Sequence, residues 1–122
     1  MKKIILFLSI LALSCNSNDN NDDTNCTEEA RAGLNVTVKD AVTQAELQEG
    51  VTVTATDGSY SEVLEYGQSS SSTFVGAWER PGNYILTVSK EGYQTFASDV
   101  ITITADVCHV IPQSVTVELQ PE

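Results

Sequence analysis

The chain has 122 residues, of which 17 are acidic and six are basic, for a formal net charge of −11. This balance argues against a nucleic-acid partner, because the basic residues beyond the N-terminus are scattered and form no stripe that could neutralise phosphates; they are Arg31, Lys39, Arg80 and Lys90. The same acidity opposes direct adsorption to an anionic membrane, so membrane attachment would need a separate anchor.

Residues 1–14 are predicted to be a lipoprotein signal peptide. Two lysines precede an apolar run, Ile4–Leu13, that is too short to span a bilayer and fits the core of a secretory signal. The run leads into LALSC, which resembles a bacterial lipobox, although Ala12 stands where leucine is commoner. We therefore expect Cys15 to be acylated and to become the first mature residue. The alternative is an ordinary signal cleaved near Ser14, which leaves Cys15 as an incidental thiol.

Residues 15–25 are predicted to be a disordered polar tether between lipid and domain. The run NSNDNNDDTN holds no apolar side chain, so it cannot bury surface to offset chain entropy. Calcium is the alternative ligand for its Asn and Asp oxygens, but the glycine and distal glutamate of an EF-hand loop are not in place. A polar, acidic run at this position resembles the export signal of bacterial surface lipoproteins. It implies an outer-membrane location, with the domain at the cell surface or facing the periplasm.

The rest of the chain, residues 26–122, is long enough for one domain with a single core. Its apolar residues alternate with polar ones at period two, which is typical of half-buried antiparallel strands. Turn-forming runs such as DGS, RPGN and KEG separate these segments. The pattern predicts an all-β domain, a seven-stranded antiparallel β-sandwich, with strands near residues 34–40, 51–57, 60–66, 72–78, 83–90, 94–104 and 114–120.

Several short motifs within this domain resemble the carboxypeptidase regulatory-like domain. They are Asp40-Ala41, Glu49-Gly50-Val51, Pro81-Gly82-Asn83-Tyr84 and Gly92-Tyr93, and the likeness extends over nearly all of residues 26–122. The run DAVTQAEL departs from that family because it lacks the glycine often found in its turn. The resemblance implies a transthyretin-like Greek key, and it implies little about function because such folds carry many roles.

Cys108 and His109 are adjacent, which raises three interpretations. A nucleophile with its base would need the two side chains to meet, whereas neighbours on a strand point to opposite faces. A zinc site needs three or four ligands at recognisable spacing, whereas this domain offers one histidine and two cysteines, dispersed along the sequence. In a sandwich of this kind the starts of the first and last strands can lie close together. We therefore expect a Cys26–Cys108 disulfide in an exported chain, with free thiols as the alternative, and His109 as a partly buried strand residue.

Aromatic and acidic side chains suggest other sites. Tyr66, Phe74 and Trp78 could form a platform for a glycan, but Phe74 and Trp78 share a strand face and are interpreted as core. The carboxylate pairs are interpreted as solvated; they are Glu62 with Glu65 and Glu28 with Glu29. The loop at residues 68–73, QSSSST, is expected to make variable contacts.

Three classes of function remain. The first is a non-catalytic envelope lipoprotein that displays a binding or structural accessory module, with a protein or glycan ligand. The second is an accessory domain that acts with a separate peptidase, as the resemblance implies. The third is a transthyretin-like hydrolase of hydroxyisourate, but that family depends on several histidines and a Tyr-Arg-Gly-Ser end, whereas this chain has one histidine and ends in LQPE. We expect no enzyme activity, no cofactor and no metal, and a membrane partner only through Cys15.

Overall fold

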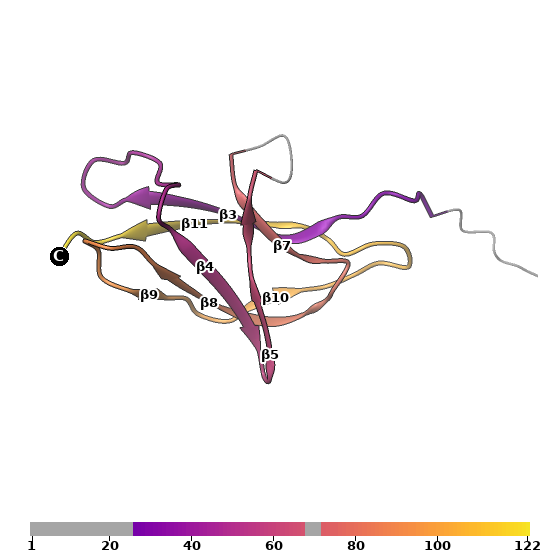
Figure 1. The fold of residues 1–122 in the computed structure, drawn as a ribbon. Helices are drawn as coiled ribbons and strands as arrows, with labels where there is room; N and C mark the ends of the chain where they lie inside the picture. Colours follow the sequence, from indigo (N-terminus) through magenta and orange to yellow (C-terminus); the bar gives the residue numbers. More distant parts are fainter. Residues whose placement is uncertain (1–25, 68–71) are drawn as a thin grey trace, which may run out of the picture.

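A computed structural model describes residues 26–67 and 72–122 of the chain. These residues form an all-β structure in which two sheets pack face to face (Figure 1). No helix among them has the length and apolar character needed to cross a membrane. The predicted signal, the lipidation site Cys15 and the tether lie outside the described residues.

The first sheet has the strand order β10-β8-β4-β5, with β9 paired to β8. All of its pairings are antiparallel. Gly58 begins the two-residue turn between β4 and β5 with φ = 61°, a conformation that favours glycine. The five strands are β4 (Thr52–Asp57), β5 (Tyr60–Val63), β8 (Gly82–Ser89), β9 (Phe96–Ala97) and β10 (Ile101–Ile103).

The second sheet has the order β11-β3-β7-β6. Its longest strand, β3, lies between β11 on one side and β7 on the other. The four strands are β3 (Ala32–Asp40), β6 (Glu65–Tyr66), β7 (Phe74–Trp78) and β11 (Gln113–Leu119).

The β3–β11 pair corrects the expectation of an entirely antiparallel sandwich. The two strands run parallel, in register from Leu34 opposite Gln113 to Asp40 opposite Leu119. Parallel neighbours need a long connection, and residues 41–112 supply it. The first and last strands therefore begin at the same end of the sandwich.

All seven predicted segments contain strands, but two of them are divided, so the described residues hold nine strands instead of seven. The most informative division falls within residues 60–66, where β5 belongs to one sheet and β6 to the other. The chain changes sheets at the buried Leu64, whose N–H donates to the carbonyl of Val53 at 2.8 Å. Gly76 permits this approach, because a Cβ there would lie 2.8 Å from Leu64 Cγ.

The core consists of the inward residues of both sheets. The alternation predicted for the four clearest segments is confirmed: their inward side chains are buried, except for Val51 and Val115, which are partly buried and pack against the core. The buried ones include Leu34, Val36, Val53, Leu86, Val88, Val117 and Leu119. Phe74 also lies in the core and packs edge-on against Tyr66, with ring centroids 4.9 Å apart.

The interpretation of Trp78 as core is wrong, because its exposed fraction is 40%. Regular strand geometry ends just before it, since Ala77 has φ = 56° and Glu79, the residue after it, has φ = 50°. Backbone of that kind breaks the alternation on which the expectation depended.

Candidate functional site

A disulfide joins Cys26 to Cys108, with the two Cα atoms 5.2 Å apart. The predicted pairing is confirmed. Cys26 lies just before β3, and Cys108 lies in the loop between β10 and β11. The bridge therefore links the segments that lead into the two parallel strands, at the end of the sandwich where both strands begin.

The loop that holds Cys108 is a tight hairpin organised by Asp106. Ala105 pairs with Val110, and the N–H of Asp106 donates to the carbonyl of His109 at 2.9 Å. One oxygen of the Asp106 carboxylate accepts the N–H groups of Cys108 and His109, each at 2.8 Å. These two hydrogen bonds, with His109 contributing most, lower the pKa of Asp106 below its usual value. Asp106 thus fixes the positions of the cysteine and the histidine together.

His109 lies in this loop and not in a strand, which corrects the expectation for it. It is 8% exposed, and both ring nitrogens have partners. Nδ1 lies 2.6 Å from Glu79 Oε2, and Nε2 lies 2.9 Å from the Thr27 hydroxyl. Because a carboxylate only accepts, Nδ1 carries a proton, and the hydroxyl pairs with Nε2 in whichever role that nitrogen requires. The ring therefore connects the start of the domain to the end of β7.

Glu79 is the common acceptor of this corner. Besides the His109 ring, it accepts the N–H of Val110 at 3.0 Å and the N–H of Arg31 at 3.0 Å. These bonds hold the pKa of Glu79 below its usual value, the bond from His109 contributing most and that from Val110 next. Its positive φ shows that the backbone here departs from regular strand geometry. One carboxylate thus ties together the segment before β3, the end of β7 and the loop before β11.

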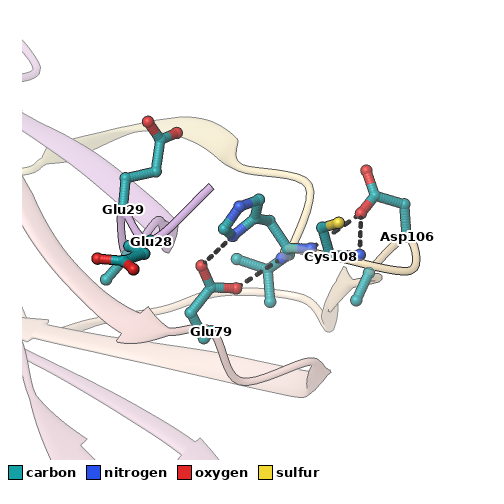
Figure 2. A pocket seen from close by; sticks show the side chains of 9 residues that line it. Glu28, Glu29, Glu79, Asp106 and Cys108 are labelled. Carbon is teal, nitrogen blue, oxygen red and sulfur yellow. Dashed lines mark hydrogen bonds and ion pairs between the residues drawn. The ribbon is translucent and has the colours of Figure 1, made fainter. Parts of the chain in front are cut away.

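A shallow cavity of about 400 Å³ lies beside this corner. Figure 2 shows Glu79 and Asp106 projecting from different segments around it, while Glu28 and Glu29 come from the chain just before β3. Four carboxylates therefore surround one small space. Among the residues that the structure describes, no group of three or more His, Cys, Asp or Glu side chains is arranged to hold a metal ion.

The order Thr27–His109–Glu79 is that of a nucleophile, a base and an orienting carboxylate. Acyl transfer also requires N–H groups aimed at a developing oxyanion. At this corner the N–H groups of Cys108 and His109 are donated to Asp106, and those of Arg31 and Val110 to Glu79. The acidic lining would also repel an oxyanion. The arrangement is better suited to holding three chain segments together than to catalysis.

Sequence reasoning missed Thr27 and Glu79 as members of this corner. The spacing Asp106-x-x-His109 is a turn signal that could have located the loop. Glu79 had no comparable signal, because its partners lie far from it in the sequence.

The other acidic pairs differ from one another. Glu62 was interpreted as solvated, but its Oε1 accepts both the Tyr60 hydroxyl and the Ala77 N–H at 3.0 Å, so it joins the two sheets. Glu65, Glu28 and Glu29 are exposed, as interpreted. In the loop at residues 68–73, residues 68–71 lie outside the described part of the chain.

Comparison with known proteins adds no identification: no family model matches the chain, and the search of curated proteins finds no relative. The fold and the corner define an all-β protein of two packed sheets, in which a disulfide joins the segments that lead into the first and last strands.

Proposed function

We propose that this protein is a lipid-anchored lipoprotein of the bacterial outer membrane that displays its β-sandwich as a non-catalytic binding or structural accessory module. The observation that carries the proposal is the Cys26–Cys108 disulfide. Such bonds persist in oxidising compartments and are rare in the cytosol. The bridge therefore supports export, and the LALSC motif with its polar run supports attachment through Cys15.

The transthyretin-like Greek key remains part of this proposal. Two packed sheets and strands in all seven expected segments support it. Local geometry at one motif supports it too: Asp40 accepts the N–H of Val42 at 2.7 Å and that of Thr43 at 2.9 Å. Asp40 thus closes the turn that follows the first strand, at the Asp-Ala position on which the resemblance depends.

The test is fractionation of cells that express the full chain with Cys15→Ala. This variant should leave the membrane fraction and appear in soluble extracts, while the native chain stays with membranes through a carbonate wash. Cys108→Ala is the matched control, because it removes a cysteine without touching the lipobox, and it should remain membrane-bound. If Cys15→Ala protein also stayed in the membrane fraction after the wash, the lipoprotein proposal would be wrong.

A further inference from the structure

The outer face of the first sheet is rich in threonine. Five threonines from three strands point away from the core on this face: Thr52, Thr54, Thr56, Thr87 and Thr102. Ser61, Ser89 and Asn83 occupy further outward positions, and Val63 and Ile85 are its large apolar residues. We call this surface the threonine face.

The threonine face carries no charged side chain at the strand positions that the structure describes. This is unusual in a domain whose residues 26–122 include 14 acidic and four basic side chains, a net charge of −10. At the end of β4, Asp57 pairs with Arg80 at 3.1 Å, and Arg80 stacks over the Tyr60 ring, which lies on the core side of β5. The outer face of the other sheet, by contrast, places Lys39 beside Glu118.

The strand register arranges these side chains in rows across the sheet. Thr54 lies between Thr87 on β8 and Val63 on β5. Beside that row, Thr56 lies between Ile85 and Ser61. Adjacent strands lie about 4.8 Å apart and alternate residues along a strand about 6.8 Å apart, so hydroxyl and methyl groups form a regular grid. A threonine hydroxyl has one donor and two acceptor positions. Thr56 donates to the carbonyl of Ile85 at 3.3 Å and Thr102 donates to Asn83 Oδ1 at 2.9 Å, so these two hydroxyls present acceptor positions to a ligand.

From this surface we infer that the threonine face binds an uncharged polysaccharide. The ligand class follows from the charge of the surface. A neutral polymer is neither attracted nor repelled by the acidic remainder of the domain, and on this face it covers no charged side chain that would lose its hydration. The rows of threonine hydroxyls can form hydrogen bonds with the hydroxyls of the polymer. The threonine methyls, Val63 at 59% exposure and Ile85 at 41% exposure offer apolar contact to the C–H faces of its sugar rings. This inference rests on the proposed display of a binding module and names its ligand class.

Co-sedimentation of the purified full chain with insoluble polysaccharide particles tests the inference. The neutral probes are cellulose, a β-1,3-glucan, a mannan and starch granules, while alginate gel and chitosan provide an anionic and a cationic arm. Thr87→Glu and Thr87→Lys place a charge of either sign near the middle of the face. Thr116→Glu is the matched control, because Thr116 is an exposed outward threonine on β11 of the other sheet. Circular dichroism confirms that each variant is folded, and Thr102→Glu on β10 provides a second test position.

The expected result is retention on at least one neutral polymer, with both Thr87 variants and Thr102→Glu weakening it roughly tenfold or more and Thr116→Glu leaving it unchanged. Failure of every neutral probe to retain the native chain would overturn the inference. The inference would also be overturned if the Thr87 variants were retained as well as the native chain. It would equally be overturned if the substitutions weakened retention on alginate or chitosan to the same extent as on the neutral polymer. Sedimentation uses purified protein, so its outcome is independent of whether Cys15 anchors the chain in cells.

Discussion

Removing the disulfide with Cys26→Ala and Cys108→Ala together should destabilise the domain strongly while leaving its fold intact. The bridge closes a loop with a sequence separation of 82 residues. The chain-entropy relation assigns a loop of that size about 4.5 kcal/mol at 25 °C, as an upper value. Because a domain of this size loses about 4–8 °C of melting temperature per kcal/mol, the midpoint should fall by at least roughly 10 °C. The sheets themselves should persist, since β3 keeps its ladders to β7 and β11.

Urea unfolding of the exported full chain, followed by circular dichroism, measures this effect. The dependence of the unfolding free energy on urea should also become steeper, because an unfolded chain without the cross-link is more expanded and exposes more surface. Cys15→Ala is the matched control, because it makes the same chemical change at a cysteine outside the bridge. If the double variant lost less than about 1 kcal/mol with an unchanged urea dependence, the entropic argument would be refuted.

Two further predictions concern the corner beside the bridge. His109→Ala should lower the unfolding free energy by about 2 kcal/mol, because it removes two hydrogen bonds of a buried ring; a change under about 0.3 kcal/mol in urea unfolding would show that the ring holds nothing. The second prediction concerns acid. Folding lowers the pKa of Glu79, so its carboxylate contributes to the free energy of unfolding at pH values above its unfolded pKa. That contribution is lost as the pH falls through the folded pKa. Glu79→Gln should therefore weaken the loss of stability between about pH 5 and pH 3, measured by urea midpoints, whereas the exposed Glu118→Gln should leave that loss unchanged.

The strand segments could be predicted because alternation and turn residues are local signals. Leu34, Val36 and Val38 face the core as their spacing requires. The disulfide could be predicted as well, since Cys26 and Cys108 are the only cysteines of the domain and both lie just before strands.

Pairing direction and sheet membership depend on contacts that no local pattern encodes. The parallel β3–β11 pair follows from which strands become neighbours. The division of residues 60–66 between two sheets depends on Gly76, a residue of another strand. Glu79 was missed for the same reason, because its backbone conformation and its partners Arg31 and Val110 become apparent only in the folded chain.

The position of the bridge also determines how the domain would carry tension. A pull applied between residue 26 and the C-terminus passes from Cys26 directly to Cys108 and along β11 to Glu122. The residues between the two cysteines, which include every other described strand, are not in series with that force. β11 carries the force directly, and to leave the sheet it would have to slide along its full parallel register with β3. Tension on the chain would thus be transmitted to the core through one strand, and the other strands of the sandwich would carry none of it along their backbone.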